Sequence, residues 1–294
     1  MKHLFLFVSI CAVLLTNLLP ASAWQTRGHG ILSEAAVMAL PPQVPAFFRK
    51  GRRMVAHASY DPDVVKNRDL PHVTDAEYAE HYFDVELLQG RTLPPTRYEY
   101  LKMCAEAKLD PKVVGLLPYT VVEWTERLSI AFAEHRKWPN NAYIQQKCLL
   151  YAGFLSHYAS DLCMPLHVTV HHNGRANTDG TSPRTGIHEK VDSLIQKLAM
   201  KPGDLAKNQK IEPVDELMPA ILKEIELSRS HIDRVYELEG KLPPLEGQWT
   251  PSPEVVSLAT ERAREATRFT AALFLAAWRN SKKVKLPDWL ERER

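Results

Sequence analysis

The sequence predicts an all-α protein, a multi-helix bundle folded as a single domain. Apolar residues recur at helical spacing over several long segments, and no convincing series of alternating strand residues accompanies them. Of the 294 residues, 45% are hydrophobic and 24% are charged, which is the usual balance of a globular protein. Since no composition shift marks a linker and no repeat is present, one domain is the simplest organisation.

Most of the predicted helices have a recognisable end. They span residues 28–40, 113–135, 141–163, 187–200, 214–238 and 253–279. The first stops at Pro41-Pro42 and the third at Pro165, because proline has no amide hydrogen with which to continue a helix. Polar residues mixed with glycine and proline predict long loops at 171–184, 201–213 and 240–251.

The first residues predict a secretory signal peptide over residues 1–23. Lys2 precedes an apolar run from residue 4 to residue 19, and Ala21-Ser22-Ala23 has the small side chains of a cleavage site. The run is shorter than the ~20 residues that a membrane span needs. We therefore expect a secreted or periplasmic domain over residues 24–294, monomeric and without a transmembrane anchor, that begins at Trp24.

The formal charge is only +2, from 37 Lys and Arg against 35 Asp and Glu. Such a balance gives no electrostatic reason for duplex nucleic acid or an anionic membrane to be an obligatory partner. Either class remains open as a substrate.

Cysteine is too rare for a disulfide scaffold. Removal of the signal peptide leaves Cys104, Cys148 and Cys163. Three cysteines allow at most one disulfide, and the sequence does not say which pair would form it.

Histidine and aspartate recur at a spacing that suits metal binding. His157 and Asp161 lie four residues apart in a predicted apolar helix, so both side chains face the same side of it. Pro165 ends that helix and lets His167 turn back toward the same side. An imidazole and a carboxylate on one face can share a divalent cation.

A second pair with the same spacing follows at His188 and Asp192. One such pair is most often a hydrogen-bonded surface pair, but two in successive helices, the first of them apolar, are harder to explain in that way. Buried imidazole and carboxylate groups need partners, and a metal ion supplies them. The spacing therefore favours a metal site in the core of the bundle. His171 and His172 lie in a polar loop, where we expect them to be solvated.

Further motifs occur in a fixed order along the chain. They are Trp24 directly at the predicted cleavage site, Gly28-His29, His81-Tyr82-Phe83-Asp84, His157 with Asp161 and His167, His188 with Asp192, and the last helix with Arg262 and Trp278. In this order they resemble the zinc-dependent phospholipase C and single-strand-specific nuclease superfamily, over nearly the whole predicted mature chain. The resemblance implies an all-α fold whose cleft holds three zinc ions, a trinuclear metal site.

The resemblance also implies a ligand set for each zinc ion. The first is expected to bind Asp63, His81, His157 and Asp161, the second His167, His188 and Asp192, and the third the free amine and carbonyl oxygen of Trp24 with His29 and the shared Asp161. The amine exists only after cleavage, so removal of the signal peptide is a step in building the site. Imidazole nitrogen and carboxylate oxygen are ligand types that suit zinc.

Asp63 is the least fixed member of this set. Asp61 is a close rival two residues earlier, and Asp69 and Asp75 also remain open. The spacing of Asp63 to Lys66 is more similar than the others to the Asp-x2-Arg pattern of the family.

The resemblance implies a hydrolase of phosphate ester bonds, a phosphodiesterase. Two neighbouring zinc ions lower the pKa of a bridging water toward ~7, and the resulting metal-bridged hydroxide attacks phosphorus. Asp63 and Asp161 are the expected catalytic residues, Asp63 because it can orient or deprotonate water. No Gly-x-Ser-x-Gly elbow, P-loop or dinucleotide fingerprint points to another chemistry.

The family divides into phospholipases and nucleases, and the sequence leans toward the first. The segment 168–174 lacks the Gly-Gly-Asn of the nucleases, and 186–192 resembles the lipase pattern, although Asp192 is more typical of a nuclease. We therefore expect a phospholipase C-like enzyme that converts phospholipid to diacylglycerol and a phosphorylated head group. The alternative is a nuclease or 3′-nucleotidase acting on single-stranded nucleic acid, and a non-catalytic metal-binding relative stays open.

Overall fold

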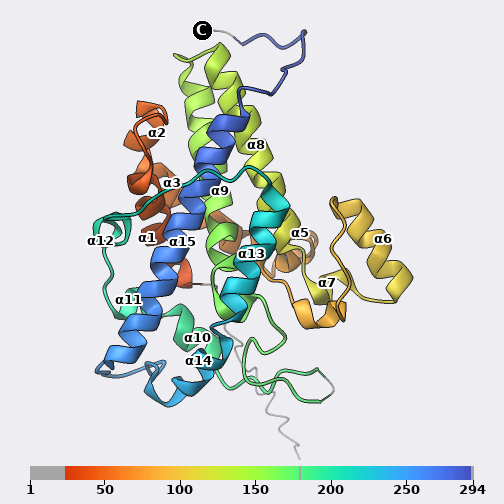
Figure 1. Ribbon diagram of the computed structural model, residues 1–294, viewed down its shortest axis with the longest axis vertical. Coiled ribbons are helices and arrows are strands. Elements are labelled where there is room, and N and C mark those ends of the chain that lie inside the picture. The colour runs from red at the N-terminus through yellow and green to blue at the C-terminus, as the bar shows by residue number, and fades with distance from the viewer. Residues whose placement is uncertain (1–23, 179, 293–294) are drawn as a thin grey trace, which may run out of the picture.

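The computed structural model describes residues 24–178 and 180–292, which form helices joined by loops (Figure 1). These residues contain no β-strand beyond two isolated bridges, Phe83 with Gly115 and His172 with Gly174. The predicted all-α class is therefore confirmed. The predicted signal peptide lies outside the described residues. None of the helices in the described part of the chain combines the length and the apolar character that a membrane crossing requires.

The helices follow one another along the chain, with 3-10 helices labelled η. In order they are α1 (Gln25–Ala39), α2 (Ala46–Lys50), α3 (Arg52–Ala58), α4 (Asp61–Val65), α5 (Pro71–Glu77), η1 (Tyr78–His81), η2 (Val85–Leu88), α6 (Arg97–Ala107), α7 (Pro111–Val114), α8 (Leu117–Lys137), α9 (Ala142–Leu162), η3 (Pro165–His167), α10 (Ile187–Asp192), α11 (Leu194–Lys197), α12 (Pro202–Ala206), α13 (Leu217–Arg229), α14 (Ile232–Glu237), η4 (Glu239–Lys241) and α15 (Pro253–Asn280).

Three long helices, α8, α9 and α15, form the centre of the bundle (Figure 1). Helix α9 packs against α8 and α15, and it also contacts α1 and α3 from the start of the described chain and η1, which carries His81. One hydrophobic cluster includes both Trp24 and Ala277, so the two ends of the described chain share one core. The helices α6 and α7 lie to one side of this core in Figure 1.

Side-chain caps fix the beginnings of α9, which carries His157 and Asp161, and of α15. The side chain of Asn141 accepts a hydrogen bond from the amide of Ile144 at 3.1 Å, which starts α9. Ser252 does the same for α15 through the amide of Val255, and Pro253 occupies the first turn.

Two segments predicted as continuous helices are each divided. Residues 187–200 form α10 and α11, and residues 214–238 hold α13 and α14. At the breaks, the hydroxyls of Ser193 and Ser230 donate to the carbonyls of Lys190 and Leu227, and such bonds compete with the helical pattern. The predicted loop 201–213 contains α12, and the short helices α2 to α6 were not predicted.

Helices α3 and α9 approach closely at Gly153, and this contact places part of the site. A Cβ atom on Gly153 would lie 2.4 Å from the Cβ of Ala58 and 2.8 Å from its carbonyl carbon. With no side chain in the way, Ser59, at the end of α3, brings its carbonyl oxygen to 2.8 Å from Nδ1 of His157. The position of the His157 ring therefore depends on the α3–α9 contact.

Gly153→Ala should destabilise the protein by about 1–3 kcal/mol, because the added methyl forces the two backbones apart. Thermal and urea unfolding measure the loss. Gly203→Ala in α12 is the matched control, since its Cβ would meet only Met38 at 3.8 Å and should leave stability unchanged or slightly raised. Equal unfolding free energies for the two variants would show that the α3–α9 contact is not tight.

A pair of buried ionisable side chains lies between α13 and α15. Glu224 and Arg262 are each 3% exposed, and Arg262 Nη1 lies 3.9 Å from Glu224 Oε1. Burial and the neighbouring Glu265 carboxylate raise the pKa of Glu224 to about 9. Glu224 is therefore a protonated carboxyl group at neutral pH.

This raised pKa has a definite sign for stability. Between the ordinary pKa of 4.5 and about 9, the folded protein holds a proton on Glu224 that the unfolded chain releases. The free energy of unfolding should therefore fall as the pH rises through that window. Glu224→Gln removes the titrating group and should flatten this dependence, whereas the exposed Glu226→Gln on the same helix should not. Urea unfolding at several pH values tests it, and parallel curves for both variants would contradict it.

Candidate metal centre

Three groups of histidine and aspartate side chains lie close together in the described part of the chain. Within each group, the atoms available to a metal lie within 4.8 Å of one another. The groups are His29 with His157 and Asp161, Asp63 with His81 and His157, and His167 with His188 and Asp192. All eight side chains predicted from the sequence therefore occur in these groups.

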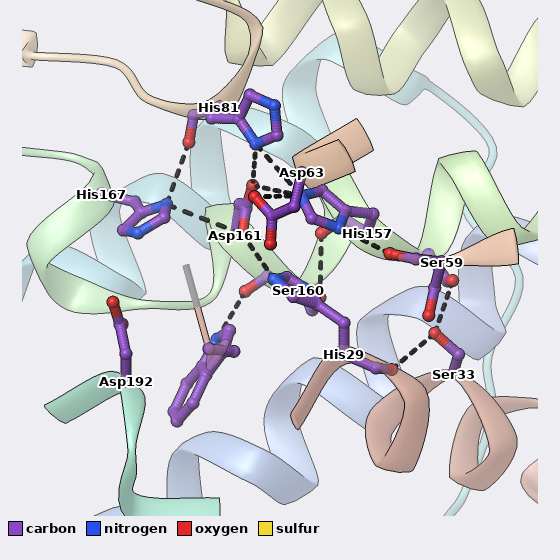
Figure 2. A network of polar contacts seen from close by, with 12 residues as sticks. His29, Ser33, Ser59, Asp63, His81, His157, Ser160, Asp161, His167 and Asp192 are labelled. Atoms are coloured by element: carbon purple, nitrogen blue, oxygen red, sulfur yellow. Dashed lines mark hydrogen bonds and ion pairs between the residues drawn. The ribbon is translucent and has the colours of Figure 1, made fainter. Parts of the chain in front are cut away.

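Asp161 lies at the centre of the arrangement, near the end of α9 (Figure 2). Its Oδ2 lies 3.0 Å from Nδ1 of His81 and 3.3 Å from Nε2 of His157. Its Oδ1 faces the other way and lies 3.4 Å from Nε2 of His29. The two carboxylate oxygens thus point to different groups, which is the geometry needed to share one aspartate between two cations.

The group around Asp63 joins α4, η1 and α9. Nε2 of His157 lies 3.0 Å from Nδ1 of His81 and 3.9 Å from Oδ1 of Asp63. Lys66, one turn later, pairs with the same Oδ1 at 2.6 Å and is itself buried. The structure places Asp63 among these rings, and Asp61 belongs to none of the three groups found in the described residues.

The remaining group joins η3 and α10. Nε2 of His167 and Nε2 of His188 lie 3.1 Å apart, with their rings stacked. Oδ2 of Asp192 lies 3.2 Å from Nε2 of His188, in keeping with the four-residue spacing on α10. Asp192 lies apart from Asp161 in Figure 2, and Nδ1 of His167 lies 3.7 Å from Oδ1 of Asp161.

Trp24 lies beside this centre. Its indole Nε1 donates to the carbonyl oxygen of Ser160 at 3.0 Å, one residue before Asp161. Its backbone interacts with the carboxylate of Asp192 and lowers the pKa of that group. The predicted use of a free amine at Trp24 depends on cleavage within residues outside the described part of the chain and stays a prediction.

Opposite charges dominate the electrostatics of the centre. Burial raises the pKa of Asp161, but the facing rings of His157, His167 and His29 outweigh burial and hold that pKa well below its ordinary value. Burial lowers the pKa of His157, but Asp161 and Asp63 more than compensate and raise it. A negative centre surrounded by imidazoles is well suited to a cation.

Burial acts differently on the group of His167, His188 and Asp192. It lowers the pKa of His167 well below the ordinary value, so that ring is neutral and can present a lone pair. Burial also raises the pKa of Asp192 to about 6, against the opposing effect of His188. A divalent ion would restore the ionised carboxylate, because metal ligands bind in their deprotonated forms.

The donor set fits zinc. Ring nitrogens of separate histidines face one another at 3.0 and 3.1 Å, and carboxylate oxygens complete each group. Oδ1 of Asp161 is buried and has no hydrogen-bond partner among the described residues. Nitrogen and carboxylate donors that converge in this way are those of known zinc sites.

Several features near the centre were not predicted. Glu77 accepts a hydrogen bond from His81. The sequence contains a signal for this contact, because the two residues lie four positions apart. His171 and His172 are half-buried rather than solvated, and the backbone carbonyl of His172 accepts from Nδ1 of His188 at 3.1 Å.

The sequence allowed at most one disulfide and left its pair open. The structure shows Cys104, Cys148 and Cys163 as buried free thiols.

No protein-family model matches the chain, and no curated protein matches it. Among solved structures, the chain is similar to the alpha toxin from Clostridium absonum, with 13% sequence identity and a TM-score of 0.47. It is also similar to the alpha-toxin of Clostridium perfringens isolated from avian strain SWCP, with 14% identity and a TM-score of 0.45. These likenesses cover 92% and 90% of this chain but only 66% and 65% of the toxins.

Proposed function

We propose that the chain is a zinc-dependent phosphodiesterase whose three groups of histidine and aspartate hold three zinc ions. The observation that carries this proposal is the position of Asp161, whose two oxygens face separate groups of imidazoles. Zinc ions bound there would lower the pKa of water toward ~7 and offset the negative charge of a phosphoryl group. The products of such a hydrolysis are a phosphomonoester and an alcohol.

Asp63 would orient the reacting water, and Lys66 would hold the carboxylate of Asp63 in place. Burial raises the pKa of Asp63, but His157 and Lys66 outweigh burial and hold it well below its ordinary value. Asp63 therefore stays ionised at neutral pH and can accept a hydrogen bond from water. Its pairing with Lys66 fixes the direction of the carboxylate. Asp63 is better suited to orienting water than to removing its proton, because a carboxylate with a lowered pKa is a weak base.

The segment beside Asp63 supports a phospholipid substrate. Val64 is 65% exposed and Leu70 is 57% exposed, and both belong to the stretch that leads from α4 to α5. Val64 directly follows Asp63 in α4, and an exposed apolar side chain at that position suits the acyl chains of a lipid better than a charged strand. The proposed reaction is accordingly phospholipase C-like, with diacylglycerol and a phosphorylated head group as products.

One observation favours the alternative, a nuclease acting on single strands. The ring of Tyr78 is 44% exposed, and the Lys66 ammonium lies 5.9 Å from its centroid. An exposed aromatic ring can stack on a base of a single strand.

Asp63→Asn should lower zinc binding and phosphodiesterase activity by more than about a hundredfold, because it removes a charged ligand from the centre. Asp61→Asn is the matched control and should leave both properties unchanged, since Asp61 lies in none of the groups of described residues. Metal analysis after gel filtration and a phosphodiester assay measure the two effects. Loss of zinc in the Asp61 variant alone would overturn the assignment of Asp63.

The substrate class is tested with the chain that begins at Trp24, after its metal content has been measured. The protein is incubated with phosphatidylcholine vesicles and with single-stranded DNA, each with and without a chelator. We expect chelator-sensitive release of diacylglycerol and intact DNA. DNA cleavage with intact lipid would support the nuclease instead, and neither activity in a zinc-loaded protein would indicate a non-catalytic relative.

A further inference from the structure

Each of the five histidines of the metal centre makes a hydrogen bond through the ring nitrogen that faces away from its group. In each ring, one nitrogen points into its group and the other bonds to a group outside it. The outer bonds are His29 Nδ1 with Ser160 Oγ at 2.8 Å, His157 Nδ1 with Ser59 O at 2.8 Å, His167 Nδ1 with His81 O at 2.9 Å, His188 Nδ1 with His172 O at 3.1 Å, and His81 Nε2 with Glu77 Oε1 at 3.2 Å.

His81 differs from the other four rings in two respects. It points Nδ1 inward, whereas the others point Nε2 inward. Its outer nitrogen also bonds to a carboxylate, whereas the outer nitrogens of the other four rings bond to backbone carbonyls or a serine hydroxyl. Among these five rings, His81 is therefore the one whose outer nitrogen is held by a carboxylate side chain.

Glu77 is itself fixed from a second direction. It is the last residue of α5, and its side chain is 17% exposed. Its Oε1, the atom that His81 contacts, also accepts a hydrogen bond from the hydroxyl of Tyr158. Tyr158 is buried in α9 directly after His157, so the carboxylate is tied to the helix that carries Asp161.

We propose that Glu77, held in place by Tyr158, is a positioning residue that orients His81 for zinc. As an acceptor, the carboxylate keeps a ring proton on Nε2, and the lone pair on Nδ1 is then available to a metal ion bound beside Asp161 and His157. A carboxylate behind a metal-binding histidine also strengthens the ring as a donor. This inference rests on the proposed function, because it assumes that the centre binds zinc.

Glu80 provides a matched control. It lies in η1, one residue before His81, but its carboxylate pairs with Arg97 and accepts from Thr120 on the outer side. Glu77→Gln and Glu80→Gln each remove one negative charge from a residue close to His81 in sequence, and of the two carboxylates only that of Glu77 contacts the ring. Tyr158→Phe removes the second hydrogen bond to Glu77 and keeps the buried ring.

The test measures zinc affinity by competition with a chelating dye, and the visible spectrum of the cobalt-substituted protein, which reports the ligands of the metal. We expect one of the zinc ions to bind Glu77→Gln about 10–100-fold more weakly, with an altered cobalt spectrum. Tyr158→Phe should show a smaller change in the same direction. Glu80→Gln should keep the wild-type affinity and spectrum, although loss of the Arg97 pair lowers its melting temperature.

The outcomes separate the inference from the proposed function. Wild-type zinc binding with equal affinities and spectra in the Glu77 and Glu80 variants would overturn the role of Glu77 and leave the proposed function standing. No zinc binding by the wild-type chain that begins at Trp24 would overturn both. If Glu77→Gln does not fold, as judged by circular dichroism, Tyr158→Phe decides, and an unchanged affinity and spectrum there would overturn the inference.

Discussion

The buried carboxylate of Asp161 is the group on which the rest of the centre depends. A carboxylate without exposure to water costs several kcal/mol unless opposite charge and hydrogen bonds compensate. Here the compensation comes from α1, η1 and α9, which bring His29, His81 and His157 to its two oxygens. The packing of these three elements therefore depends on the electrostatics of the centre, and the electrostatics of the centre depend on that packing.

The outer bonds of the histidines extend this dependence into the backbone. The carbonyl of Ser59 fixes His157, and the carbonyl of His81 fixes His167, so one metal group is linked to the next through the main chain. Close packing at Gly153 sets the first of these contacts. Small shifts between helices are transmitted to the ring nitrogens, because a close-packed interior deforms as a unit.

The short stretch from α4 to η1 carries both residues of the metal centre and exposed side chains. It carries Asp63, the positioning residue Glu77 and His81 on the inner side. It also exposes apolar side chains and the ring of Tyr78 beside the same centre. Metal binding and the choice of substrate are thus expected to depend on the same segment.

The sequence by itself determined the all-α class, the long helices α8, α9 and α15, and the pairs His157 with Asp161 and His188 with Asp192. These features are local, since helical periodicity places residues four apart on one face. The tertiary structure decided the grouping of Asp63 in place of Asp61, the division of two predicted helices, and the contact of Glu77 with His81 and Tyr158. His81 and Asp161 are separated by 80 residues, and only the packing of η1 against α9 brings them to 3.0 Å. No local sequence pattern predicts that contact, because it is set by how whole helices pack together.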